Sequence, residues 1–163
     1  EMPATFHTLK IADDLRRELD SQFGGLLGLK LCDIGSMSHL MGADRLSRDQ
    51  PFIVIEPLSS DSDALALGQT WEITDEFRII YGRAYSDGVS PTREVINAAR
   101  TIADHLISKP DASFVVLPRG NVDEARVTSI AWADSPEQEA MEILELPIRV
   151  VAMTYQIKYD VTN

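Results

Sequence analysis

The chain has 163 residues, 44% of them hydrophobic and 25% charged, which is the composition of a globular domain rather than of a disordered or membrane-spanning chain. At this length about 70% of the surface of the unfolded chain can be buried on folding, so we expect a single domain over residues 1–163. The formal net charge is -11 and the fifteen basic residues are scattered, which argues against a groove for nucleic-acid phosphates.

The first predicted element is an amphipathic helix in LKIADDLRRELDSQFGG. Ile11, Leu15 and Leu19 recur at helical spacing, while charged residues occupy the opposite side. Thr8 is a possible N-cap. The glycine pair at 24–25 is expected to end the helix, because glycine readily adopts the left-handed conformation found at helix ends.

Residues 26–50 keep neither a helical nor a strand period for long. A short strand around Leu29 to Ile34 and a short helix around Met37 to Leu46 are both possible there. The run PFIVIEPL, bounded by Pro51 and Pro57, then has the signature of a strand. We interpret the following SSDSDALALGQ as a polar connection.

The next stretch, TWEITDEFRIIYGRAYSDG, alternates between apolar and polar residues and predicts one or two antiparallel strands. The strongest helix pattern follows in SPTREVINAARTIADHLISKPD. Ser90 is a good N-cap, Pro91 suits the first helical position, and Lys109-Pro110 closes the helix. Its apolar stripe consists of Val95, Ala99, Ile102 and Leu106.

Three further runs, FVVLP, ARVTSIAWA and ILELPIRVVAMTYQIKY, predict an antiparallel meander. In the last run Val151, Met153, Tyr155, Ile157 and Tyr159 share one face. Ile148, Val150 and Ala152 lie on the other, so both faces are covered near Val150 or a bulge intervenes.

The order of these elements predicts an α+β fold: a mostly antiparallel β-sheet with an N-terminal helix and a central long helix packed on one face. The last strand is long enough to outrun its neighbours, and we expect its overhanging edge to be offered to another chain.

We assign no catalytic, cofactor-binding or metal-binding residue from the sequence. His7, His39 and His105 lack the spacing of a shared metal site on one element, and the isolated Cys32 in apolar company is typical of a core residue. One cysteine also excludes a disulfide framework, which favours a reducing compartment. The start EMPATFHTLK has no signal-peptide pattern, so we expect no secretion signal.

Other chemistry-bearing residues have plain structural interpretations. The acidic Asp61 and Asp63 lack the later ligands of a calcium loop, and the glycines at 24, 25 and 28 follow a helix, unlike a phosphate-binding loop. The remaining candidates are expected to be charged surface or core packing: Glu142, Glu145, Trp71, Trp132, Arg119, Arg126 and Arg149.

The element order resembles that of a known family. Five elements, from about residue 9 to 159, together resemble the tail terminator or tail-completion proteins of long-tailed bacteriophages. They are the helix IADDLRREL, the strand PFIVIEPL, the strand EFRIIYGRAY, the helix PTREVINAARTIADHLI and a closing hairpin ending in MTYQIKY. The resemblance implies a virion tail protein, assembled in the host cytoplasm, and not an enzyme. It implies a homo-oligomeric ring, usually a hexamer, that caps the head-proximal end of the tail tube.

Such a ring stops tube polymerisation, contacts the tail tube protein and a neck or head-completion protein, and lets DNA pass through its lumen without specific binding. Two alternatives stay open. One is a neck or head-completion protein, or the cap of a contractile injection device. The other is a small α+β enzyme with a dispersed site, built from residues such as His39, His105 and Asp134.

Overall fold

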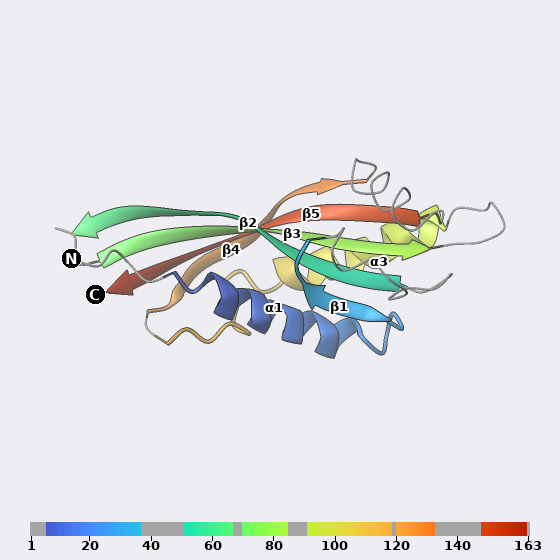
Figure 1. Ribbon diagram of the computed structural model, residues 1–163, viewed down its shortest axis with the longest axis horizontal. Helices are drawn as coiled ribbons and strands as arrows, with labels where there is room; N and C mark the ends of the chain where they lie inside the picture. The colour runs from blue at the N-terminus through green and yellow to red at the C-terminus, as the bar shows by residue number, and fades with distance from the viewer. Residues whose placement is uncertain are drawn as a thin grey trace.

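The computed structural model describes residues 6–36, 51–66, 70–84, 91–118, 120–132 and 148–162. In these ranges it is an α+β structure in which two helices cover one face of a five-stranded sheet, as the sequence predicts (Figure 1). None of the helices in the described part is long and apolar enough to cross a membrane. The elements in chain order are α1 Thr8–Phe23, β1 Leu31–Ile34, β2 Pro51–Ala66, β3 Thr70–Ala84, α3 Thr92–Ile107, β4 Val122–Ala131 and β5 Ile148–Thr162.

The strands lie in the order β1-β2-β3-β5-β4. The β1–β2 pair is parallel and the other three pairs are antiparallel, so the prediction of a mostly antiparallel sheet is confirmed. The last strand outruns one neighbour as expected, since its ladder with β3 is longer than its ladder with β4, but the expectation of a free edge is wrong, because β5 lies between β3 and β4. It pairs with β3 from Ile148 to Thr162, and β4 covers its other side from Ala152 to Tyr159.

The polar connection expected after Pro57 is also wrong, because β2 continues as a strand to Ala66. Residues 57–63 are exposed on both sides of the strand, which is why their sequence does not alternate between apolar and polar residues. Its pairing with β3 is what keeps it extended. Register shifts occur between Pro57 and Ser59 and between Ala64 and Ala66, and the first of them accommodates a proline that has no N–H to donate.

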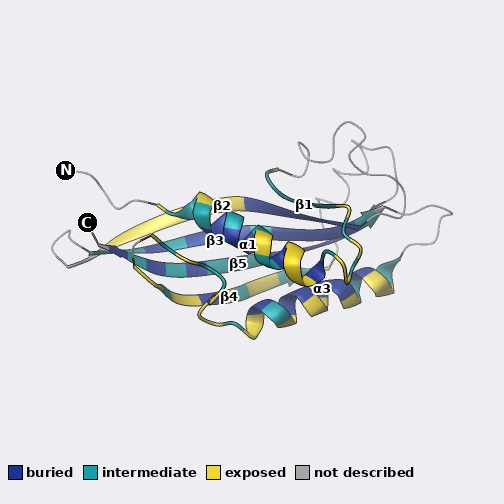
Figure 2. Ribbon diagram, turned by 90° about the horizontal axis from the view of Figure 1, so that it is seen from below, coloured by how far each residue is buried: buried dark blue, intermediate teal, exposed yellow. Residues whose placement is uncertain are grey.

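The helix-facing side of the sheet forms the core with α1 and α3. The predicted stripes of both helices are buried against the odd-numbered residues of β3 and β5, and Figure 2 shows both helices with their buried side toward the sheet. The largest fully buried side chains include Tyr155, Tyr159, Phe52, Phe77, Ile11 and Leu15.

One end of the opposite face is buried as well, which confirms the prediction that both faces are covered near Val150. Phe52, Ile80 and Val150 are each at most 1% exposed there. Gly82 lies among them, and a Cβ at this position would come within 2.5 Å of Phe52 and 2.6 Å of Val150. Glycine is therefore required by close packing at Gly82 rather than by a turn.

Several predicted boundaries shift. The helix α1 begins at Thr8, so His7 rather than Thr8 occupies the N-cap position, and it makes no side-chain cap. The helix ends at Phe23 as expected, but Gly24 keeps a right-handed conformation and Gly28 takes the left-handed one. In α3 the N-cap position is Pro91, one residue later than expected, and Ser90 lies outside the described residues.

The predicted strand FVVLP is not a strand. The N–H of Val115 donates to the carbonyl oxygen of Ala112, and the N–H of Val116 donates to the Asp14 carboxylate of α1 at 3.1 Å. These bonds hold the segment in a loop, because they use the groups that a strand ladder needs. The short β1 is confirmed, whereas the possible helix from Met37 to Leu46 lies outside the described residues.

Candidate functional site

The candidate site is an acidic surface on the face of the sheet that the helices do not cover. The bulge after Pro57 shifts the alternation of β2, so that Ser59, Asp61 and Asp63 pair with Glu76, Thr74 and Glu72 of β3. These β3 residues face away from the helices, because Ile73, Phe77 and Ile79 face the core. Cross-strand partners share a face, so Asp61 and Asp63 join the helix-free face.

The same rows continue across β5 and β4. Thr74 pairs with Lys158, which pairs with Glu124, and Glu72 pairs with Asp160. The Asp123 carboxylate, next to a register shift in β4, reaches the same place. We call this surface the acidic face. Its acidic members are Asp61, Asp63, Glu72, Glu76, Asp123, Glu124 and Asp160, and its basic members are Arg126 and Lys158.

A paired row separates the acidic face from the buried apolar end of the sheet. Glu56 and Arg78 are direct cross-strand partners, and Arg78 donates to Glu56 through Nε at 2.7 Å and through a second guanidinium nitrogen. Charge is balanced in this row. The net negative charge therefore begins beyond it, toward the end of the sheet where β2 and β5 end (Figure 1).

Three carboxylates crowd together at that end. Oxygens of Glu72, Asp123 and Asp160 lie within 4.8 Å of one another. Partial burial, a hydrogen bond to Asp160 and the charges of Asp160 and Glu72 raise the pKa of Asp123 above its usual range. Asp123 is exposed and the other two are half-buried, so this cluster makes a surface that repels anions, and we do not assign it as a metal site.

A buried polar network lies beneath the acidic face, on the helix-facing side. Asp75 is 0% exposed and accepts hydrogen bonds from Ser60 Oγ at 2.5 Å and from Tyr159 OH at 2.9 Å. The Tyr159 hydroxyl in turn accepts from the N–H of His7 at 3.0 Å, and Thr8 Oγ1 lies 3.1 Å from Ser60 Oγ.

This network anchors the start of α1 to three strands of the sheet. Burial raises the pKa of Tyr159, so the hydroxyl keeps its proton and remains the donor to Asp75. In this series of hydrogen bonds the His7 N–H therefore donates to the Tyr159 hydroxyl, which in turn donates to the Asp75 carboxylate. Asp75 was not among the residues that the sequence pattern singled out, although its odd-numbered place between Ile73 and Phe77 was the available signal.

Among the described residues, His7, Cys32 and His105 lie on different elements. His7 lies at the start of α1, whereas His105 Nε2 lies 2.7 Å from Glu18 Oε2 and links α3 to α1. Cys32 lies in β1, where burial first and the charge of Asp20 second raise its pKa to about 12, so its thiolate is scarce. His39 and Asp134 lie outside the described residues.

The other sequence candidates are spread over the fold. Trp71 packs beside the core in β3, and Trp132 follows the end of β4 with 38% of its surface exposed. Arg149 donates to the Trp132 carbonyl, and Arg126 donates to the Gln156 side chain. The candidates Arg119, Glu142 and Glu145 lie outside the described residues.

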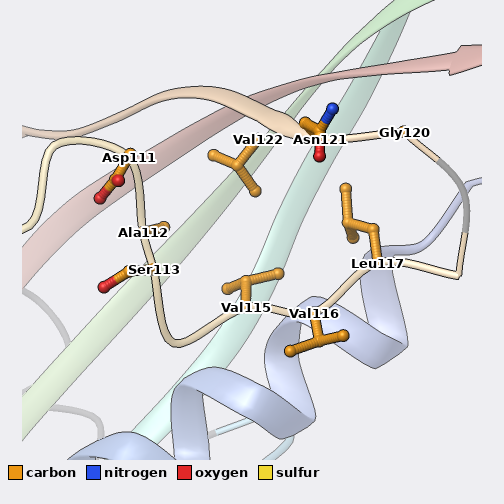
Figure 3. Close-up of a pocket in the computed structure, with 9 residues that line it drawn as sticks. All are labelled: Asp111, Ala112, Ser113, Val115, Val116, Leu117, Gly120, Asn121 and Val122. Carbon is orange, nitrogen blue, oxygen red and sulfur yellow. The ribbon is translucent and has the colours of Figure 1, made fainter.

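A cavity of about 320 Å³ lies under the loop between α3 and β4. Figure 3 shows it lined by Val115, Val116, Leu117 and Val122, with Asp111 at one end. Asp111 is the single ionisable residue among the described residues of this lining, and alone it does not supply the pair of titrating groups that acid–base catalysis requires.

Comparison with known proteins gives a structural likeness and no sequence family. No family model matches the chain, and no curated protein matches it. Among solved structures 23 chains match, including one from a structure described as "Virion of native gene transfer agent (GTA) particle". It superposes with a TM-score of 0.54 at 12% identity, covering 94% of this chain and 95% of that chain. At this identity the likeness shows a shared fold, and the coverage extends it to nearly the whole of both chains.

Proposed function

We propose that the chain is a structural protein of a phage-like virion and, within that class, a tail terminator. In this proposal, copies of the chain form a ring, a hexamer, on the head-proximal end of the tail tube. The ring stops the addition of tube subunits and provides the surface for a neck or head-completion protein. The observation that carries the proposal is the shared fold, over nearly the full length of both chains, with a chain of the gene transfer agent virion.

The acidic face supports this role through its electrostatics. DNA that passes through a ring must not be held there, and lysine or arginine on the wall would bind phosphates with release of counterions. A wall that carries carboxylates repels the phosphates instead. The acidic face has Asp61, Asp63, Glu72 and Glu76 on two neighbouring strands, and we assign this surface to the lumen.

The proposal implies a location in the virion tail, with assembly in the host cytoplasm, and no enzymatic activity or cofactor. Its partners are further copies of the chain, the tail tube protein and the neck.

The oligomeric state tests the ring. Mass photometry and native mass spectrometry of the purified chain, at increasing concentration and with tail tube subunits added, are expected to show a particle of six times the 18.1 kDa chain. Identical copies in a ring use heterologous contacts that close on themselves. A strict monomer under all these conditions, with no binding to tube subunits, would contradict the proposal.

A further inference from the structure

The outer edge of β2 is hydrogen-bonded to other backbone in its first part and not in its second, among the described residues. From Phe52 to Ile55 it pairs with β1, and Gly35 N donates to Ile55 O at 3.0 Å just beyond that ladder. Lys30 N donates to Pro51 O on the same side. The N–H and C=O groups of odd-numbered residues therefore point outward in this part of β2, because these groups alternate along a strand.

Beyond Pro57 the outward groups belong to even-numbered residues. The bulge places Ser59 opposite Glu76, whose backbone N–H and C=O point toward β2. The N–H and C=O of Ser59 therefore point toward β3, and those of Ser60 and Ser62 point outward. Both residues are exposed. Among the described residues, no other strand lies beside this stretch, and no backbone hydrogen bond reaches it from outside β3. We call the regular run between the two bulges, residues 59–64, the β2 edge.

The opposite edge of the sheet is protected. In β4 the N–H of Ala125 points away from β5 and donates to the carbonyl oxygen of Pro110 at 2.7 Å. Register shifts after Val122 and after Val127 leave only a short regular stretch. Occupied donors and bulges are the devices by which natural sheets prevent the addition of a strand. The β2 edge has a bulge at each end, but its central donors and acceptors are exposed.

The charges beside the β2 edge select what can pair with it. Asp61 and Asp63 flank the free backbone groups on the acidic face, and Glu72 and Glu76 lie on the next strand. A second copy that paired through its own β2 edge would set these carboxylates against each other, which is unfavourable in a cross-strand pair. A segment with lysine or arginine at alternate positions would instead match both the backbone and the charge.

We propose that the β2 edge binds an extended, positively charged segment of a partner protein, which adds to the sheet as a strand. Main-chain hydrogen bonds to Ser60 and Ser62 supply the affinity, and Asp61 and Asp63 select the basic side chains. This inference goes beyond the proposed function, since it concerns a contact that a single copy of the chain can make. Its test does not depend on ring formation.

The test uses the full chain, labelled with ¹⁵N, and an eight-residue peptide of alternating lysine and valine. Amide hydrogen exchange read by NMR is expected to slow at least tenfold at Ser60 and Ser62 on peptide binding, with Ala125 unchanged. The matched control peptide, with glutamate in place of lysine, is expected to leave both amides unchanged because of its charge.

Three variants separate strand addition from general electrostatic attraction. Ser62→Pro removes an outward N–H that β3 does not use, so the fold is expected to survive while peptide affinity falls at least tenfold. Ser62→Ala is expected to bind as the unmodified chain does. The doubly substituted Asp61→Lys, Asp63→Lys chain is also expected to lose tenfold or more. Equal affinity in Ser62→Pro, or binding without protection of Ser60 and Ser62, would overturn the proposal.

Discussion

Replacing Ile157 with aspartate is expected to abolish cooperative folding. Ile157 is 0% exposed on the helix-facing side of β5, and its direct partners are Asp75 of β3 and Ala125 of β4. The new carboxylate would be buried without a cation and set opposite another buried carboxylate. An unpaired buried charge costs about 4 kcal/mol or more, which is comparable with the whole free energy of unfolding of a typical domain, about 5–15 kcal/mol.

Circular dichroism with urea titration measures this effect, and Lys158→Glu is the matched control. Lys158 is the next residue, half-buried on the acidic face between Thr74 and Glu124, so we expect its substitution to change the free energy of unfolding by about 1 kcal/mol or less. A variant Ile157→Asp with a urea midpoint close to that of the unmodified chain would show that burial of this face of β5 does not stabilise the fold.

The second large effect is expected from Asp75→Ala, which should lower the free energy of unfolding by about 2–4 kcal/mol. The substitution removes the acceptor of two hydrogen bonds and leaves the buried hydroxyl of Tyr159 without an acceptor. It also loosens the contact between Tyr159 and the His7 N–H at the start of α1. We therefore expect faster amide exchange at His7 in addition to a lower urea midpoint.

Asp63→Ala is the control for this experiment, because Asp63 is an exposed aspartate on the neighbouring strand. Its effect should stay within about 0.5 kcal/mol. Asp75→Asn keeps an acceptor for Tyr159 and should lower the free energy of unfolding by less than Asp75→Ala does. If Asp75→Ala and Asp63→Ala had the same midpoint, and exchange at His7 were unchanged, the network would have no role in fixing α1.

Elements with a clear period were predictable from the sequence. β3 and β5 alternate between apolar and polar residues, and α3 has an apolar stripe of Val95, Ala99, Ile102 and Leu106. Each pattern arises because one side of the element is buried, so the pattern predicts the element. The helix-covered antiparallel sheet followed from their order. Residues 57–63 of β2 were not predictable as a strand in this way, because they are exposed on both faces and their backbone pairing with β3 is what makes them a strand.

The position of β5 and the acidic face needed the structure for a different reason. Strand order is a set of pairings between residues far apart in the chain, and a local pattern in β5 does not tell which strands flank it. The acidic face depends further on the bulge near Pro57, since a shift of one residue moves Asp61 and Asp63 to the other side of the sheet. The net charge of the chain indicated acidity without its location.

The length of tail tubes assembled in the presence of the chain tests the central proposal most directly. Purified tube protein, polymerised alone and then with increasing amounts of the chain, is measured by electron microscopy. We expect short tubes that carry a ring at one end, with a mean length that falls as the ratio of chain to tube subunits rises. Tubes of unchanged length, with no ring at either end at any ratio, would contradict the assignment of this protein as a tail terminator.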